Sequence, residues 1–204
     1  MTSKLFKISV QLIPFTAAAS SANELRQPPA DHKSPTNSDK SNDDIAISAS
    51  LVRTDFEISG EFTLRGDTST IQWPALESQA KPGTELWKHT CFELFIAEAT
   101  SHAYLEYNFS PSRRWATYAF EDYRLPALSN ITSQPEIDPL QLTHNTFSMQ
   151  FRLPLVTELL NKSLAVGVCA VIETTDGARR YFALTHCAQK PDFHLRDSFL
   201  IKMN

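Results

Sequence analysis

Basic residues and glycine are scarce in this sequence of 204 residues, and the scarcity of basic residues excludes two kinds of partner. The 19 Lys and Arg are outnumbered by 23 Asp and Glu, so the formal net charge is −4. Nucleic-acid binding needs a basic face that displaces counterions from phosphates, and binding to an anionic membrane needs a polybasic run. The sequence shows neither pattern, so we expect neither nucleic acid nor membrane as a partner.

Cysteine is also scarce. Cys91, Cys169 and Cys187 form an odd set without a CxxC spacing, which predicts neither a disulfide framework nor a zinc ribbon. Cys91 and Cys169 lie in apolar runs, where free cysteines are typically small buried hydrophobes of a reducing compartment. The cysteines therefore favour a cytoplasmic protein.

Long apolar runs are missing as well, and no stretch approaches the length that spans a bilayer. At the N-terminus, basic residues precede Ile8–Ala19 as they do in a secretory signal, but polar residues and Pro14 interrupt the apolar stretch. We therefore predict a first strand over Leu5–Phe15. A signal peptide stays open as the alternative and would imply a periplasmic or secreted protein.

The segment from Ala17 to Asp44 has a different composition from the rest. Leu25 is its only large apolar residue, and the other positions are mostly Pro, Ser, Asn, Asp and Lys. Such a stretch cannot bury enough surface to offset the entropy lost on ordering. We predict one domain over residues 1–204, with 17–44 as a mobile loop insertion.

The remaining sequence has the pattern of an all-β protein. The 12 Pro disfavour long helices, and apolar residues alternate with polar ones in about ten short runs bounded by turn residues. We predict an antiparallel β-sandwich with one short helix at Leu155–Asn161, where Pro154 suits the opening turn.

The segment Leu86–Arg124 is typical of a three-stranded meander, with strands near Cys91–Ala97, Ala103–Phe109 and Trp115–Phe120. Alternate side chains of a strand point to opposite faces of its sheet. We expect the following residues of the meander and of a later strand to face the core: Phe92, Leu94, Ile96, Leu105, Tyr107, Phe109, Ala116, Tyr118, Phe120, Phe182 and Leu184.

The opposite face of the meander gathers polar side chains. Neighbouring strands lie ~4.8 Å apart, so Glu93, Glu106 and Asn108 can share one patch with Trp115 at its margin. Carboxylates and a carboxamide suit sugar hydroxyls, and an indole offers a flat face to a sugar ring. An ordinary solvated sheet face shows the same alternation, so this patch alone does not establish a site.

Three parts of the meander carry a family resemblance: LW-x-HTCFE-x-F-I at Leu86, Y-x-E-x-N-x-SP at Tyr104, and W-x-x-Y-x-F-x-x-Y-R at Trp115. With A-L-T-H and K-P-D-F-H near the C-terminus, they resemble the DOMON-like domains of bacterial proteins, which are similar to family 9 carbohydrate-binding modules. The insertion at 17–44 departs from the compact pattern of that family.

The resemblance implies a jelly-roll or immunoglobulin-like β-sandwich that binds sugar or haem and is not an enzyme. It implies that the ligand face holds Trp87, Glu93, Glu106, Asn108, Trp115, Arg124, His186 and His194. Two carboxylates would repel an anionic sugar, so we expect an uncharged or weakly charged saccharide, and no other cofactor is implied.

Haem stays open as an alternative ligand, because b-type haem needs axial His or Met. The chain has six His, but Met149 shares a face with Phe147 and Phe151, which favours packing. A metal site at His89 and Cys91, or at His186, Asp192 and His194, has no recognised ligand spacing.

Catalysis and protein binding are two further hypotheses for the same residues. Glu93 and Glu106 could approach the ~5–5.5 Å separation of a retaining glycosidase, but an open sheet face offers no cleft. His186 and Cys187 are adjacent on the chain and would point to opposite faces. We therefore expect a ligand-binding module, and an interaction module for another protein remains open.

Overall fold

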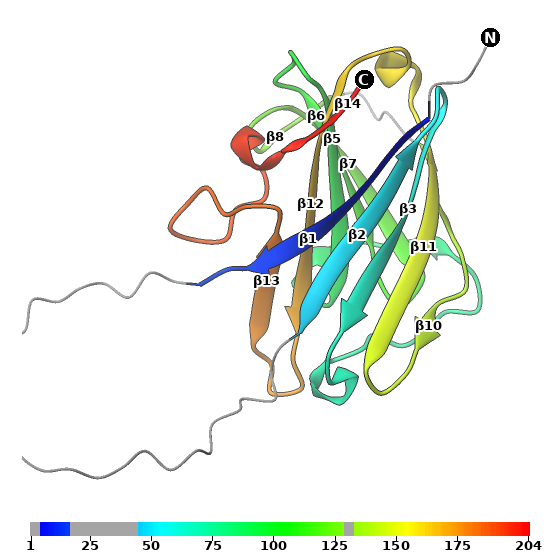
Figure 1. The fold of residues 1–204 in the computed structure, drawn as a ribbon, viewed down its shortest axis with the longest axis vertical. Coiled ribbons are helices and arrows are strands. Elements are labelled where there is room, and N and C mark those ends of the chain that lie inside the picture. Colours follow the sequence, from blue (N-terminus) through cyan, green and yellow to red (C-terminus); the bar gives the residue numbers. More distant parts are fainter. Residues whose placement is uncertain (1–4, 17–44, 129–132) are drawn as a thin grey trace, which may run out of the picture.

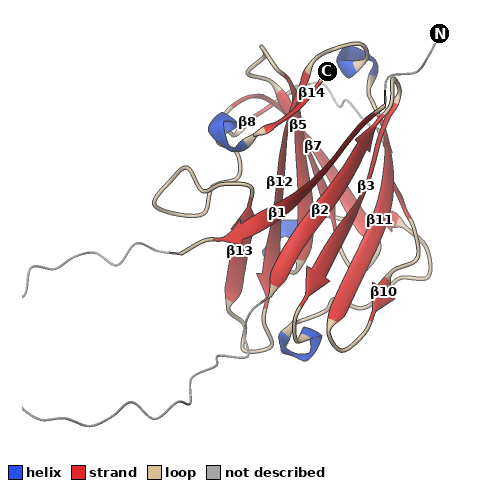
Figure 2. Ribbon diagram, in the orientation of Figure 1, coloured by secondary structure: helices blue, strands red, loops and turns tan. Residues whose placement is uncertain are grey.

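The computed structural model describes residues 5–16, 45–128 and 133–204, and this part of the chain is all-β. Strands form its body, and the only helices in these ranges are 3-10 helices of three residues each (Figures 1 and 2). The predicted all-β class is confirmed. The helix expected at Leu155–Asn161 is a single turn, η3, at Thr157–Leu159.

The strands are β1 Phe6–Pro14, β2 Ala46–Arg53, β3 Glu57–Arg65, β4 Lys81–Pro82, β5 Cys91–Glu98, β6 Tyr104–Phe109, β7 Arg114–Asp122, β8 Leu125–Pro126, β9 Glu136–Ile137, β10 Gln141–Leu142, β11 Thr146–Pro154, β12 Leu164–Glu173, β13 Arg179–Ala183 and β14 Ile201–Met203. The other 3-10 helices are η1 Thr68–Thr70, η2 Leu86–Lys88 and η4 Arg196–Ser198.

The strands pair as one curled sheet in the order β10-β11-β3-β2-β1-β13-β12-β5-β6-β7-β4. All neighbours are antiparallel except β4 and β7. The first half, from β10 to β1, joins the second half, from β13 to β4, through two residue pairs, Ile13 with Ala183 and Pro14 with Phe182. Two separate sheets are therefore not confirmed, although the two halves lie opposite each other (Figure 1).

Phenylalanine rings fill the space between the two halves. Phe62 of β3 packs against Phe92 of β5 at 5.1 Å and against Phe151 of β11 at 5.5 Å between ring centroids. Phe109 of β6 packs against Phe151 at 4.6 Å. Gly60 leaves room for the Phe151 ring, since a Cβ at Gly60 would lie 2.8 Å from that ring. This aromatic core fixes which face of the second half points inward.

The predicted inward faces of β5 and β6 are confirmed. The side chains that are buried in this core are Phe92, Leu94, Ile96, Leu105, Tyr107 and Phe109, together with Phe182 of β13; Leu184 packs against them half-buried.

The predicted face of β7 is wrong. Trp115 pairs with Phe109 and Ala119 pairs with Leu105, so Trp115 and Ala119 point to the core. Ala116, Tyr118 and Phe120 point to the opposite face of the second half. Both faces of β7 carry apolar side chains, so alternation does not reveal its register, and a one-residue error exchanges the two faces.

The strand predicted at Leu5–Phe15 is confirmed as β1, which pairs with β2 from Phe6 to Leu12. The predicted mobile insertion at 17–44 lies outside the described residues. Among the described residues, no helix has the length and apolar character needed to cross a membrane.

Leu105→Ala tests the face assigned to β6. We expect it to lower the free energy of unfolding by about 2–5 kcal/mol, because truncating a buried Leu leaves a cavity. Leu125→Ala, at an exposed position of β8, is the matched control and should change stability by less than about 0.5 kcal/mol. Urea denaturation measures both, and equal effects would show that Leu105 is not in the core.

Candidate functional site

The outer face of the second half, which points away from the Phe62 core, is covered by the chain that follows β13. Phe199 lies over Gly167 of β12, where a Cβ would come within 2.9 Å of its ring. Phe199 also packs against Phe95 of β5 at 5.5 Å and Tyr104 of β6 at 5.7 Å. Phe193 and His194 pack on the same face, and we call residues 191–199 the covering segment.

This cover changes the character of the polar patch predicted from the sequence. Every residue of β5 except Glu98 is buried, and so is every residue of β6, because both faces of the two strands are packed. Glu93, Glu106 and Asn108 are exposed by only 3%, 4% and 0%. The patch is therefore not the open sheet face that we expected. It is buried beneath the chain that follows β13.

A cavity of about 420 Å³ opens over Glu93 and Glu106, which form its floor. We call it the outer cavity. Its lining residues are Trp87, Glu93, Glu106, Tyr118, Phe120, Arg124, Val171, Arg179, Tyr181, Pro191, Phe193 and His194. Aromatic side chains therefore make up much of its wall, and the two buried carboxyls are its principal polar groups besides the arginines and the histidine.

Glu93 lies in the middle of β5, between Asn108 of β6 and Cys169 of β12. The Cys169 thiol donates to Glu93 Oε2 at 3.4 Å, whereas Oε1 has no hydrogen-bond partner among the described residues. Burial, and then the nearby Glu106, raise the pKa of Glu93 to about 8. At neutral pH, Glu93 is thus mostly an uncharged acid with unused hydrogen-bonding capacity that faces the cavity.

Glu106 is held by Asn108, whose Nδ2 donates to Glu106 Oε1 at 2.9 Å. Burial raises the pKa of Glu106 to about 7, and the Asn108 hydrogen bond and the charge of Arg124 oppose this shift. Asn108 Oδ1 is buried and has no partner among the described residues. Asn108 therefore holds Glu106 from the next position on the same face of β6 and does not line the cavity.

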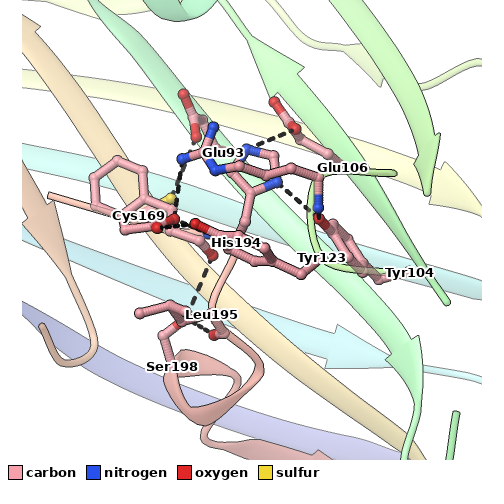
Figure 3. A network of polar contacts seen from close by, with 11 residues as sticks. Glu93, Tyr104, Glu106, Tyr123, Cys169, His194, Leu195 and Ser198 are labelled. Atoms are coloured by element: carbon pink, nitrogen blue, oxygen red, sulfur yellow. Dashed lines mark hydrogen bonds and ion pairs between the residues drawn. The ribbon is translucent and has the colours of Figure 1, made fainter. Parts of the chain in front are cut away.

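His194 reaches the floor from the covering segment (Figure 3). The backbone N–H of Arg124 donates to the Tyr104 hydroxyl at 3.1 Å, and that hydroxyl lies 2.8 Å from His194 Nδ1. Burial, followed by the charge of Arg124, lowers the pKa of His194 to about 4, so the ring is neutral. Either the phenol or Nδ1 can be the donor of this contact, and the other ring nitrogen, Nε2, lies 3.7 Å from Glu106 Oε2.

Asp192 fixes the position of this histidine. Its Oδ1 accepts from the His194 backbone N–H at 3.1 Å and from Arg124 Nη2 at 3.0 Å, and its Oδ2 accepts from the Tyr123 hydroxyl at 2.6 Å. Arg124 is thereby held in an ion pair at the rim of the cavity. The network joins the covering segment to the turn after β7 (Figure 3).

The structure brings together five of the eight predicted ligand-face residues: Trp87, Glu93, Glu106, Arg124 and His194.

Three predicted site residues do not line the outer cavity, and two of them lie elsewhere in the fold. Trp115 packs against the core on the other face of β7, and Asn108 lies beside Glu106 on the same face of β6, outside the cavity lining. His186 lies with its Nε2 3.0 Å from the carbonyl oxygen of Ile13 and its ring against Phe15. The pairing register of β7 and the path of the covering segment explain these differences.

Sequence reasoning missed seven lining residues: Tyr118, Phe120, Val171, Arg179, Tyr181, Pro191 and Phe193. The wrong face of β7 concealed Tyr118 and Phe120. The two-residue period of β12 and β13 could have placed Val171 and Tyr181 together, because they pair directly. We found no sequence signal for Phe193, whose position depends on how the cover folds back.

The structure also bears on the metal and haem hypotheses. Met149 is fully buried in the core beside Phe147 and Phe151, which confirms its packing role. Within the described ranges, no group of three His, Cys, Asp or Glu side chains converges as a metal site would require. His89 instead pairs with Glu173 at 2.8 Å.

The raised pKa values predict how stability depends on pH. A carboxyl whose pKa is higher in the folded state binds more protons when folded, so stability falls as pH rises between its unfolded and folded pKa values. The lowered pKa of His194 acts in the opposite direction, and only below about pH 6.5. Between pH 6.5 and 8, each titrating carboxyl should remove up to ~1.4 kcal/mol per pH unit.

Thermal unfolding of the protein and of Glu93→Gln measures this effect. We expect the melting temperature of the unmodified protein to fall from pH 6.5 to 8, and that of Glu93→Gln to fall less, because glutamine cannot ionise. Parallel curves for the two proteins would contradict the assignment of a buried, uncharged Glu93.

Comparison with known proteins shows a shared fold but does not assign the chain to a family. No protein-family model matches the sequence, and no curated protein matches it. A candidate carbohydrate-binding protein from Bacteroides uniformis ATCC 8492 has a similar structure, with a TM-score of 0.53 and 12% identity over 76% of this chain and 77% of that chain. At this identity, the likeness shows a shared fold alone.

Two structures of a family 9 carbohydrate-binding module from Caldicellulosiruptor kristjanssonii, one with glucose and one with cellotriose, have TM-scores of 0.48 and 11% identity. Each match covers 72% of this chain, and 70% or 69% of the module. The resemblance to DOMON-like domains stays a prediction.

Proposed function

We propose that this chain is a non-catalytic carbohydrate-binding module and that the outer cavity is its binding site. The observation that carries the proposal is the combination of aromatic walls with a buried polar floor that has unused hydrogen-bonding capacity. Its volume of about 420 Å³ lies within the ~300–1,000 Å³ range of small-molecule sites.

The walls suit the apolar faces of a sugar ring. Trp87, Tyr118 and Phe120 come from η2 and β7, and Tyr181 and Phe193 come from β13 and the covering segment. The Trp87 side chain is exposed by 42%, so its indole is available at the rim. Flat rings bury large apolar area and pack well against the C–H face of a saccharide.

The floor suits sugar hydroxyls, which both donate and accept hydrogen bonds. A protonated Glu93 can donate to one hydroxyl and accept from another, and its Oε1 has no other partner among the described residues. Leaving such a buried polar atom unpaired costs ~1–3 kcal/mol, which a ligand hydroxyl would recover.

The fold shared with the Bacteroides uniformis protein supports the same function, because that protein is described as carbohydrate-binding.

Titration calorimetry against a panel of mono- and oligosaccharides tests the proposal. We expect weak binding that Tyr181→Ala weakens by about tenfold, equivalent to ~1.4 kcal/mol, because one aromatic wall is lost. Phe56→Ala removes an exposed aromatic side chain outside the cavity and should leave the affinity unchanged. If binding survives Tyr181→Ala unchanged, the site is wrong; if no saccharide binds, the function is wrong and a protein-binding module becomes the better hypothesis.

A further inference from the structure

The floor of the outer cavity has two acids and lacks a matching positive charge. Among the described residues, the hydrogen-bond partner of Glu93 is a thiol, and that of Glu106 is a carboxamide. Two cations line the cavity, Arg124, which is paired with Asp192 at 3.0 Å, and Arg179, which is exposed on β13; among the described residues neither forms an ion pair with Glu93 or Glu106. Because an isolated buried carboxylate is costly, burial shifts both acids towards the protonated form in the absence of a cation.

The groups around Glu93 and Glu106 do not supply that cation. Cys91 on β5 and Cys169 on β12 are buried thiols whose pKa values are raised by burial, so they stay protonated. Tyr104 on β6 and Tyr118 on β7 also have raised pKa values. His194 from the covering segment is neutral, because burial lowers its pKa.

The walls are also suited to a cation. A ligand ammonium within ~6 Å of an aromatic ring is attracted by the negative face of the ring, and the attraction grows when water is excluded. Five aromatic side chains line the cavity above Glu93 and Glu106. A compact ammonium on a sugar ring could therefore contact a carboxylate below and an aromatic face beside it.

We propose that the outer cavity selects sugars that carry a free amino group, with the ammonium seated against Glu93 and Glu106. This inference rests on the proposed carbohydrate site and adds its specificity. The ammonium supplies the missing charge, the acids ionise, and the sugar hydroxyls take up the remaining hydrogen bonds. Binding of a charged amine to a protonated acid pair releases a proton to solvent.

Calorimetry at pH 6.5 with glucosamine, glucose and N-acetylglucosamine tests this selectivity. The three sugars share one ring and differ in the substituent at one carbon, which is charged in glucosamine alone. We expect glucosamine to bind at least about tenfold more tightly than either neutral sugar, or ~1.4 kcal/mol. Its binding heat should vary with the ionisation enthalpy of the buffer, which reports proton release.

Glu93→Gln is the matched variant, because it keeps the shape of the side chain and removes its charge. The ratio of glucosamine to glucose affinity should fall towards one in Glu93→Gln and stay unchanged in Phe56→Ala. Circular dichroism shows whether each variant is folded.

The outcomes separate this inference from the proposed function. Equal affinity for glucosamine and glucose would overturn the inference and leave a carbohydrate site standing, whereas no binding of any sugar would overturn both. Tighter binding of glucuronate than of glucosamine would show that Arg124 and Arg179 at the cavity lining decide specificity, and it would also overturn the inference.

Discussion

The burial of two carboxyls on neighbouring strands is the constraint on which the rest of this site depends. Glu93 and Glu106 lie on the outer face of β5 and β6 and are almost fully shielded from solvent. Neither has a cation as hydrogen-bond partner within the described residues. Their surroundings therefore favour the uncharged acids, and the cavity above them holds polar atoms that only a ligand or water can satisfy.

The fold provides this environment in two steps. The phenylalanine core between the two halves of the sheet holds β5, β6 and β7 in a fixed register. The chain after β13 then folds back over the outer face, where Phe199 packs above Gly167 and Asp192 positions His194. The sheet thus holds Glu93 and Glu106 in place, and the chain after β13 excludes water from one side of these two carboxyls.

Much of the sheet could be predicted from the sequence, because Glu93, Glu106 and Asn108 fall on one face of β5 and β6 and the large apolar residues fall on the other. The register of β7 could not, since Trp115 and Ala119 on one face and Tyr118 and Phe120 on the other are all compatible with burial. The cover could not be predicted either, because the contact of Phe199 with Gly167 joins distant parts of the chain. The acids were therefore found, but their burial and most of the aromatic wall were not.

The most direct test of this account is a carbon-13 NMR titration of the Glu93 and Glu106 side-chain carboxyls in the ligand-free protein. The account predicts two coupled titrations with apparent pKa values of about 8 and about 7. If both carboxyls instead titrate near 4.5, the usual value for glutamate, they are solvated or paired, and a buried acidic floor does not exist.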